Sequence, residues 1–171
     1  MSLLDEIEAQ IPALRRHARA LTRDASRADD LVQDCLERAV AARDRFRGPE
    51  AGGGSLRGWL FRILTNLHRD ALRRDSLRSH LVVAGDLPEP ARPGGQEAHL
   101  ALREVEAALT RLPEDQRRAL LLVAVEGLSL AEAAQALDIA EGTLVSRLGR
   151  ARASLRAMTG REPRRERKAE R

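Results

Sequence analysis

Arginine dominates the basic residues of this 171-residue chain, because Lys168 is the only lysine among 30 basic side chains. The planar guanidinium group donates paired hydrogen bonds to phosphates and to base edges, a geometry that lysine does not offer. Positive charge is concentrated near the end of the sequence: from Leu144 onward there are ten basic and three acidic residues. This charge pattern predicts a polyanionic partner such as a nucleic acid. The arginine bias taken alone is equally typical of a GC-rich genome.

The sequence that leads into this basic region is typical of a helix-turn-helix. Ser129 and Glu132 have the spacing of a capping box, and a short amphipathic helix follows as far as Leu137. Residues 138–140 (Asp-Ile-Ala) predict a tight turn. A final helix then places four apolar residues on one face, namely Leu144, Leu148, Ala151 and Leu155.

Polar side chains lie beside the apolar stripe of this final helix, where a recognition helix faces the major groove. They are Thr143, Ser146, Arg147 and Arg150. A bidentate arginine–guanine contact discriminates against other bases by about 1–3 kcal/mol. Arg152 and Arg156 lie further round the helix, in positions better suited to phosphates. The alternative interpretation is a solvated basic face on a helical hairpin.

Helical periodicity also precedes the helix-turn-helix. One helix ends at Leu112, before Pro113. A second, over Asp115–Val125, is apolar almost all round, so we expect it to be central. Gly127 ends it.

The first 80 residues predict three helices. The first has one apolar face formed by Ile7, Ile11, Leu14, Ala18 and Leu21. Ser26, with Asp29 three residues later, predicts the N-cap of the second helix, in which we expect Cys35 to be buried. Ser55 predicts the N-cap of the third, in which we expect Trp59 to anchor the core rather than stack on a base.

Amino-acid composition predicts the fold class, and the positions of proline and glycine predict where the domains divide. Only three residues are aromatic, whereas strong helix formers dominate, so we expect an all-α protein. The segment Leu81–Glu97 contains three prolines and three glycines, which predicts a flexible linker. We therefore expect two small helical domains over residues 1–80 and 98–160, joined by a linker over residues 81–97. Residues 161–171 lack apolar positions and predict a basic disordered tail.

Several function classes are disfavoured. The longest apolar runs are far shorter than the roughly 20 residues of a membrane span, and the acidic start does not resemble a signal peptide. We therefore expect a cytoplasmic protein without membrane insertion. The four histidines, which we expect at the surface or at helix boundaries, have no metal-ligand spacing, and a single cysteine excludes a disulfide or cysteine cluster. We predict no catalytic residues, no metal site and no cofactor. The histidines are His17, His68, His80 and His99.

Two separate blocks resemble the extracytoplasmic-function (ECF) σ factors, a group of the σ70 family. Residues 112–117, 127–134 and 142–152 are similar to region 4 of that family. Residues 28–34 (Ala-Asp-Asp-Leu-Val-Gln-Asp) resemble region 2.2. Residues 55–63, which include Trp59, resemble regions 2.3 and 2.4 together with Asn66 and Asp70. The resemblance covers about residues 8–80 and 98–158, in the family's order.

The resemblance implies a division of labour between the two parts. The first would bind core RNA polymerase through the coiled coil of the β′ subunit, with Asp30, Gln33 and Asp34 as contacts. It would also capture and melt the −10 promoter element through Ser55, Leu56, Asn66, Arg69 and Arg73. The second would lie at the β flap and read the −35 element through Thr143, Ser146, Arg147, Arg150 and Arg152. The resemblance also implies an anti-σ factor as a further partner.

Three residues depart from the family's region 4. Val145 stands where Lys or Arg is usual, Ala140 where a capping Ser is common, and Gly149 is unusual inside a helix. The missing cap costs about 1 kcal/mol. We still expect this region to bind DNA, but these changes leave its preference for a particular −35 sequence open. The run Gly52–Gly54 leaves the −10 base preference open in the same way.

Two rival functions remain. One is a σ-mimic that sequesters an anti-σ factor without binding DNA; known mimics carry a receiver domain after the σ-like part, and we expect none here. The other is a plain helix-turn-helix repressor, which leaves the blocks Asp29–Asp34 and Trp59–Asn66 without a purpose. Transcription directed by added core polymerase separates the three.

Overall fold

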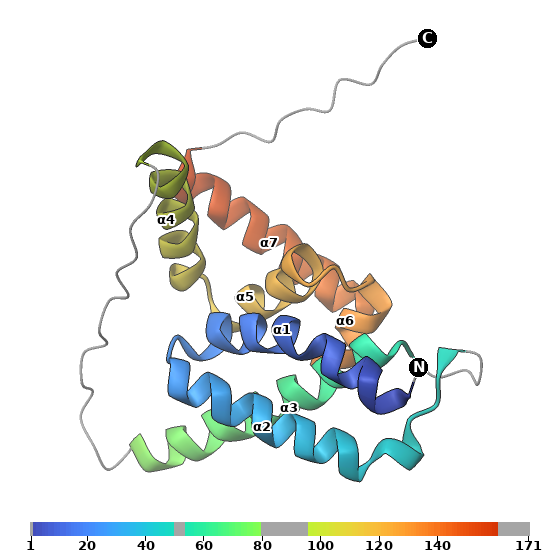
Figure 1. Ribbon diagram of the computed structural model, residues 1–171. Helices are drawn as coiled ribbons and strands as arrows, with labels where there is room; N and C mark the ends of the chain where they lie inside the picture. The colour runs from blue at the N-terminus through green and yellow to red at the C-terminus, as the bar shows by residue number, and fades with distance from the viewer. Residues whose placement is uncertain (1, 50–53, 80–95, 161–171) are drawn as a thin grey trace.

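The computed structural model describes residues 2–49, 54–79 and 96–160, and every regular element within these ranges is helical. This result confirms the predicted all-α class. Figure 1 shows two bundles, one above the other in that view. The first bundle comprises α1 (Leu3–Thr22), α2 (Ala25–Ala41), the 3-10 helix η1 (Arg43–Arg45) and α3 (Leu56–Ser79). The second comprises α4 (Gln96–Arg111), α5 (Glu114–Leu120), the π-helical segment η3 (Leu121–Val125), α6 (Leu130–Leu137) and α7 (Glu141–Thr159).

The predicted linker and tail fall almost entirely outside the described residues. Only the last two linker positions, Gln96 and Glu97, are described, and they already belong to α4. The tail over residues 161–171 is not described.

The first bundle buries the faces that periodicity predicts, with one correction at a helix start. Ile7, Leu14, Ala18 and Leu21 are buried along α1. The predicted N-cap Ser26 is wrong: Asp24 caps α2 by accepting a 2.8 Å hydrogen bond from the Arg27 backbone N–H. Left-handed backbone at Arg23 ends α1 and brings the chain directly to Asp24, so the next helix begins two residues earlier than predicted.

Helix α3 begins and packs as its sequence predicts. The Ser55 hydroxyl accepts a 3.0 Å hydrogen bond from the Gly58 backbone N–H, as an N-cap should. Trp59 is half-buried against the core, with its ring centroid 5.1 Å from that of Phe46. Cys35 is fully buried, and this burial raises the pKa of its thiol to about 12. Cys35 is therefore an inert core residue, as predicted.

The second bundle confirms the helix-turn-helix and corrects the helix before it. Ser129 and Glu132 form the predicted capping box at the start of α6. The segment Asp115–Val125 is not a single buried helix, because α5 ends at Leu120 and a π-helical turn continues to Val125, which is 48% exposed. The wider π turn changes the direction of the side chains that follow it. Leu121 and Leu122 are therefore buried, whereas Val125 at the end of the segment faces solvent. Gly127, at φ +67°, then turns the chain toward α6.

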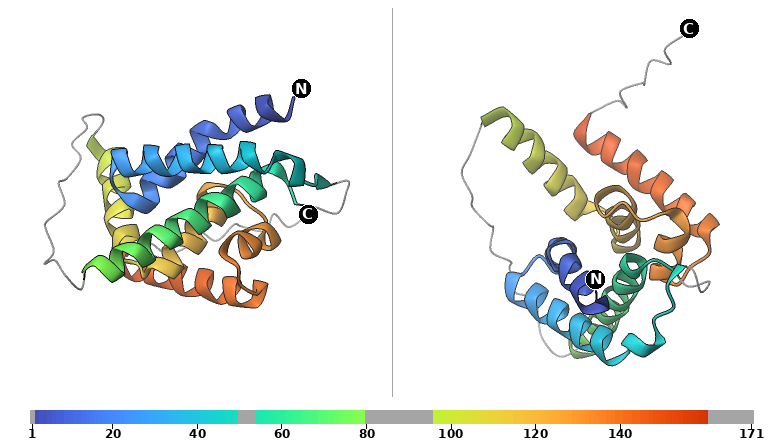
Figure 2. Two further views of the ribbon diagram at one scale, coloured as in Figure 1. Left: turned by 90° about the horizontal axis from the view of Figure 1, so that it is seen from below. Right: turned by 45° about the vertical axis from the view of Figure 1, so that its right-hand side comes forward.

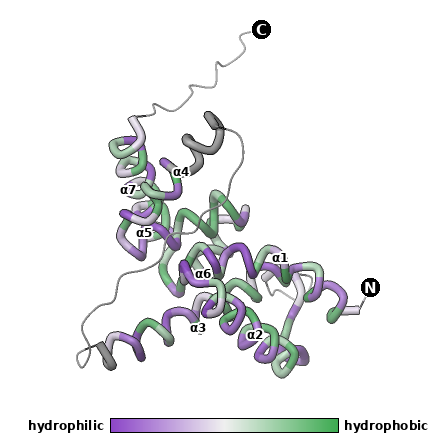
Figure 3. The backbone as a smooth tube through the Cα atoms, turned by 60° about the vertical axis from the view of Figure 1, so that its left-hand side comes forward, coloured by the Kyte–Doolittle hydropathy of each residue, from purple (hydrophilic) through white to green (hydrophobic). Residues whose placement is uncertain are grey.

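The two bundles are packed against each other rather than separated. Helix α3 lies along α6, as both views of Figure 2 show, and the buried apolar side chains of the two bundles form one contiguous cluster. Most helices in Figure 3 alternate between hydrophobic and hydrophilic stretches. Each helix therefore has an apolar side to bury, and part of that burial takes place between the bundles.

Candidate nucleic-acid interface

The predicted recognition residues lie together on α7, the second helix of the helix-turn-helix. Thr143, Ser146, Arg150 and Arg152 are exposed. Within this group, Arg150 Nη2 donates a 3.3 Å hydrogen bond to Ser146 Oγ. The opposite face of α7 buries Leu144, Leu148 and Ala151 against the bundle. The apolar stripe therefore turns the polar face outward, as the sequence pattern requires.

Arg147 differs from its neighbours because it already has an acidic partner. Its Nε lies 3.3 Å from Asp115 Oδ2 on α5, and its side chain is 24% exposed. The two residues of α7 that depart from the family pattern, Val145 and Gly149, both lie at the surface. Val145 is 51% exposed, and a Cβ added at Gly149 would meet no atom within 4 Å. Ala140 supplies no side-chain cap, so that start of α7 lacks the usual hydrogen bond.

The predicted −10 residues lie along α3, but two of them face the second bundle. The Ser55 hydroxyl donates a hydrogen bond to Glu132 on α6, and this bond is the main cause that lowers the pKa of that carboxyl. Arg69 Nη1 lies 3.9 Å from Asp138 Oδ2. Leu56 and Asn66 are half-buried, whereas Arg73 is exposed. The predicted set is therefore in part covered by the helix-turn-helix.

The predicted polymerase contacts lie on α2, the helix that packs on α1 and α3. Asp30, Gln33 and Asp34 are all exposed. Gln33 Nε2 donates a 3.0 Å hydrogen bond to Glu37 one turn further on, which extends the acidic, amide-bearing face. In contrast to Ser55 and Arg69, none of the three has a recorded contact with the second bundle within the described residues.

Sequence reasoning missed a polar cluster that joins the bundles around Glu126. Its carboxylate has no exposed surface, and Arg16 Nη2 donates to Oε2 at 2.7 Å while Arg16 Nε donates to Oε1 at 3.3 Å. Arg57 Nη2 lies 3.0 Å from Oε2 and also donates to the Glu126 main-chain oxygen at 2.9 Å. These partners are 110 and 69 positions away. No local sequence signal could have joined them.

Two histidines that we predicted at surfaces or helix boundaries are buried, so that prediction was wrong. His17 is 1% and His68 is 4% exposed. His17 packs edge-on against Phe61, and its Nδ1 lies 3.8 Å from Glu126 Oε1. His68 Nε2 lies 3.3 Å from Glu114 Oε1. Both lie where the bundles meet, which periodicity within one helix does not reveal. His80 lies outside the described residues, and the side chain of His99 is not described.

Burial governs the ionisation of this cluster. Burial is the main cause that lowers the pKa of His17 to about 3, and His68, Arg118, Arg16 and Arg57 add unfavourable positive charge. His17 is therefore neutral at neutral pH. The pKa of Glu114 is also lowered: burial opposes its ionisation, but the hydrogen bond with His68 and the charge of Arg117 outweigh that effect.

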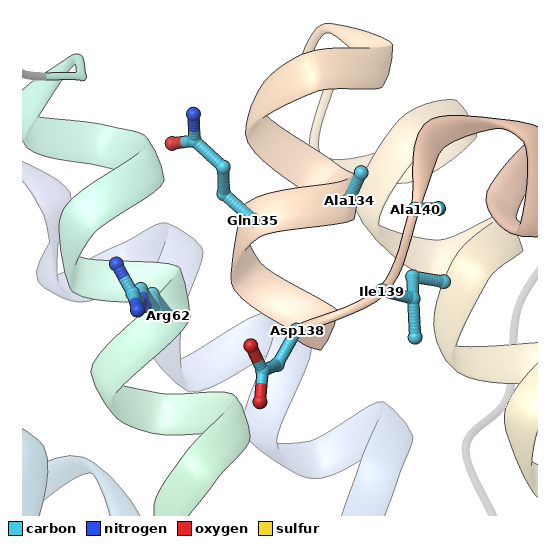
Figure 4. Close-up of a pocket in the computed structure, with 6 residues that line it drawn as sticks. All are labelled: Arg62, Ala134, Gln135, Asp138, Ile139 and Ala140. Atoms are coloured by element: carbon cyan, nitrogen blue, oxygen red, sulfur yellow. The ribbon is translucent and has the colours of Figure 1, made fainter.

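A shallow cleft of about 320 Å³ lies between α3 and the turn that joins α6 to α7 (Figure 4). Arg62 on α3 faces the polar side chains of Gln135 and Asp138, and the remaining lining is aliphatic. Across the described ranges, no cluster of histidine, cysteine or acidic residues is suited to a metal ion. Among the helices that were described, none combines the length and apolarity that a membrane crossing requires.

Comparison with known proteins places both bundles in one family. Residues 7–65 match the model described as the Sigma2 domain of PhyR, and residues 102–155 match that of Sigma-70, region 4. The chain is 43% identical over 163 residues to the ECF RNA polymerase sigma factor EcfG of Rhodopseudomonas palustris, covering 92% of this chain and 84% of that protein. It is 37% identical to SigM of Mycobacterium tuberculosis, covering 86% and 71% respectively.

Solved structures show the same architecture. The sigma factor RpoE of Bartonella quintana, in complex with the anti-sigma factor NepR, is 32% identical, with a TM-score of 0.76 and coverage of 93% of this chain and 97% of that one. PhyRSL of Sphingomonas sp. Fr1, also in complex with NepR, is 27% identical, with a TM-score of 0.65 and coverage of 95% and 93%. The chain belongs to the ECF family of RNA polymerase sigma factors. It is thus a transcription initiation factor that directs promoter-specific initiation.

Proposed function

We propose that this σ factor binds core RNA polymerase through the outer face of α2 and the β flap through the second bundle. The exposure of Asp30, Gln33 and Asp34 supports the first contact, because a partner can reach them without any rearrangement of the bundle. An acidic face of this kind complements a basic coiled coil. The polymerase carries out RNA synthesis, and this chain directs the polymerase to the promoter.

The −35 element is read by α7 in this proposal. Thr143, Ser146, Arg147 and Arg150 face the base edges, and Arg152 contacts a phosphate. The single observation that carries the proposal is the exposed polar face of α7 on a capped helix-turn-helix, because that geometry presents side chains to a major groove. Val145 is exposed on the side of α7 that carries Arg152 and Arg156, so its methyl groups lie beside the proposed phosphate contact.

The −10 element is captured at the start of α3. Ser55 and Leu56 stand where an extruded base would enter, Asn66 faces the promoter, and Arg69 and Arg73 follow the backbone of the opened strand. Extruding a base costs a few kcal/mol, and contacts to the flipped base and the single strand offset that cost. Residues 55–73 of the first bundle and residues 143–152 of the second thus act on one promoter.

A σ-mimic is the second candidate, and one observation favours it: residues 7–65 match the Sigma2 domain of PhyR. An anti-anti-sigma factor of that name shares the fold at 24% identity. The 43% identity to a protein named as an ECF sigma factor, across both bundles, supports the σ factor instead. In either case we infer that an anti-σ factor similar to NepR is a partner, because two of the similar structures, RpoE and PhyRSL, were solved in complex with NepR.

Run-off transcription tests the proposal. The purified chain is added to core RNA polymerase with pooled genomic fragments, and the 5′ ends of the transcripts are mapped. We expect starts that cluster downstream of one shared pair of −35 and −10 sequences. Binding of an anti-σ protein without any initiation would identify a mimic, and binding of DNA without core polymerase but no initiation would identify a repressor.

A further inference from the structure

The two arginines of the proposed base-reading face are held in different ways. Arg150 is exposed, and its recorded hydrogen bond runs to Ser146, one turn earlier on the same helix. Arg147 is half-buried and pairs with another helix instead, because its Nε lies 3.3 Å from Asp115 Oδ2 on α5. The direction of the Arg147 guanidinium group is therefore set by two elements, α5 and α7, which pack against each other.

The pair of Asp115 and Arg147 lies within the second bundle. Asp115 is in the first turn of α5, and Arg147 is in the second turn of α7. Because both helices belong to this bundle, the pair does not depend on how the two bundles pack together. It is therefore available in every state in which the second bundle is folded, including one in which α7 lies on DNA.

The charges around Arg147 explain what the carboxylate of Asp115 does there. Burial is the largest cause that lowers the pKa of Arg118, and the positive charge of Arg147 contributes to the same shift. The two guanidinium groups therefore repel each other. Without Asp115, this repulsion and the many rotamers of a free arginine would let Arg147 turn toward solvent or toward a phosphate. With Asp115, the paired charges cancel, so a phosphate attracts Arg147 less strongly.

The pairing leaves the outer end of the Arg147 guanidinium group available. Asp115 faces Nε, whereas the two Nη nitrogens carry the remaining N–H groups. Guanine presents O6 and N7 on its major-groove edge, and these two acceptors match such a pair of donors. A guanine contacted through Nη1 and Nη2 leaves the contact with Asp115 in place. The same arginine can therefore be held by the protein and read a base.

We propose that Asp115 is a positioning residue for −35 recognition, which directs Arg147 toward one guanine of the box and away from the DNA backbone. The inference rests on the proposed function of α7 and adds a residue outside that helix which makes one of its arginines selective. For Arg150, no acidic partner is recorded among the described residues, so its base contact lacks this restraint. Loss of the Asp115 charge should therefore lower selectivity at one base pair without weakening the general attraction to DNA.

Asp115→Asn in the full chain tests the proposal, with Glu141→Gln as the matched control. Each substitution neutralises an acidic residue in the first turn of a helix of the second bundle, but Glu141 is exposed at the start of α7. Fluorescence anisotropy is measured with duplexes that change the −35 box one base pair at a time. Selectivity at a base pair is the ratio of the affinities for the original and the altered box.

The expected loss of selectivity is confined to one base pair. At the base pair that Arg147→Ala identifies, Asp115→Asn should lower the ratio by about threefold or more, because an arginine that must first be ordered binds less well. The ratio at the base pair that Arg150→Ala identifies should not change. Every ratio of Glu141→Gln should equal that of wild type.

A double-mutant cycle separates positioning from damage to the fold. If Asp115 acts through Arg147, Asp115→Asn should change no ratio in a protein that already carries Arg147→Ala. Wild-type ratios in Asp115→Asn would overturn the proposal. A loss shared by all base pairs, or one that persists beside Arg147→Ala, would also overturn it, because either result indicates general damage to the second bundle.

The free protein supplies a measurement that does not depend on DNA. The Nε–H signal of Arg147 in a proton–nitrogen correlation spectrum is identified by its absence from Arg147→Ala. It should exchange with water about threefold more slowly in wild type than in Asp115→Asn, because a paired N–H must first be released. Equal exchange would overturn the contact. If wild type neither directs transcription nor selects any −35 duplex, the proposed function and the selective role are both wrong, while the exchange rates still decide whether Asp115 holds Arg147.

Discussion

At the scale of single residues, charge and burial decide what each polar group can do. Arg147 is the proposed base-reading arginine, yet it lies beside Asp115 and is less exposed than Arg150. Asp115 holds the guanidinium in an oriented position, which reduces the freedom lost on binding. It also competes with a guanine for the same donors.

Arg147→Ala should weaken binding to the −35 box and leave core binding intact. The loss of a bidentate contact predicts a change of about 1–3 kcal/mol, or roughly 5- to 150-fold, at one position of the box. Fluorescence anisotropy with duplexes that vary base by base measures this loss, and titration with core polymerase is the control. A uniform loss across all duplexes would contradict base reading, and loss of core binding would contradict the region-4 assignment.

His17 should make the protein less stable in mild acid. Its pKa is lowered to about 3 in the folded state against an ordinary value of 6.5, so the unfolded chain binds more protons between these values. Protonation of His17 therefore does not reduce the free energy of unfolding well above pH 6.5. As the pH falls below 6.5, this residue lowers the free energy of unfolding by at most about 1.4 kcal/mol per pH unit.

Urea unfolding followed by circular dichroism between pH 5.0 and 6.5 measures that slope above the ordinary range of carboxyl groups. His17→Gln should flatten it, whereas the control His68→Gln retains His17 and should keep it. The groups that face His17 are Glu126 from the second bundle and Arg16, Arg57, His68 and Arg118 around it. An equal slope in His17→Gln would show that another of these groups titrates instead.

At the scale of elements, each helix has one packed face and one face left for a partner. Helix α2 buries Leu31, Cys35 and Ala39, and its opposite side presents Asp30, Gln33 and Asp34 to solvent. Helix α7 repeats this arrangement with a basic outer face. The sign of the charge on the outer face separates the proposed polymerase contact from the proposed DNA contact.

Asp30→Ala combined with Gln33→Ala should weaken association with core polymerase. Both side chains are exposed, so their removal costs little folding stability, while two polar contacts worth about 1 kcal/mol each predict a loss of at least tenfold in affinity. Titration of labelled protein with core polymerase measures it, and an equal melting temperature shows that the fold is kept. Unchanged affinity would remove both residues from the docking face.

At the scale of the whole molecule, charge is distributed unevenly while the net charge is only +4. The basic end of the sequence begins on α7, where Arg152 and Arg156 are exposed. The packing of the two bundles leaves this basic surface of α7 exposed but covers part of α3. Free protein should therefore bind duplex DNA weakly, mainly through phosphates.

Arg152→Ala together with Arg156→Ala should make DNA binding less sensitive to salt. Each phosphate contact that is lost reduces the slope of log affinity against log salt by about one, because fewer counterions are released. Anisotropy with one promoter duplex from 50 to 200 mM salt measures the two slopes. Identical slopes in wild type and variant would place these arginines away from the DNA.

The sequence alone determined the features that depend on local periodicity and capping. The all-α class, the buried Cys35, the capping box at Ser129 and the outward polar face of α7 follow from side-chain spacing within one helix, where neighbours three and four positions apart share a face. The N-cap of α2 at Asp24 was missed because two capping residues compete within three positions.

Only the tertiary structure decided how the bundles meet. The contacts of Glu126 with Arg16, Arg57 and His17, and the hydrogen bond of Ser55 with Glu132, join positions 69 to 110 residues apart. Neither the π turn at Leu121–Val125 nor its exposed Val125 has a periodic signature. A buried charge must be paired because leaving it unpaired costs free energy. That cost arises only when distant helices pack together and remove water from the charge, so the sequence of one helix does not reveal it.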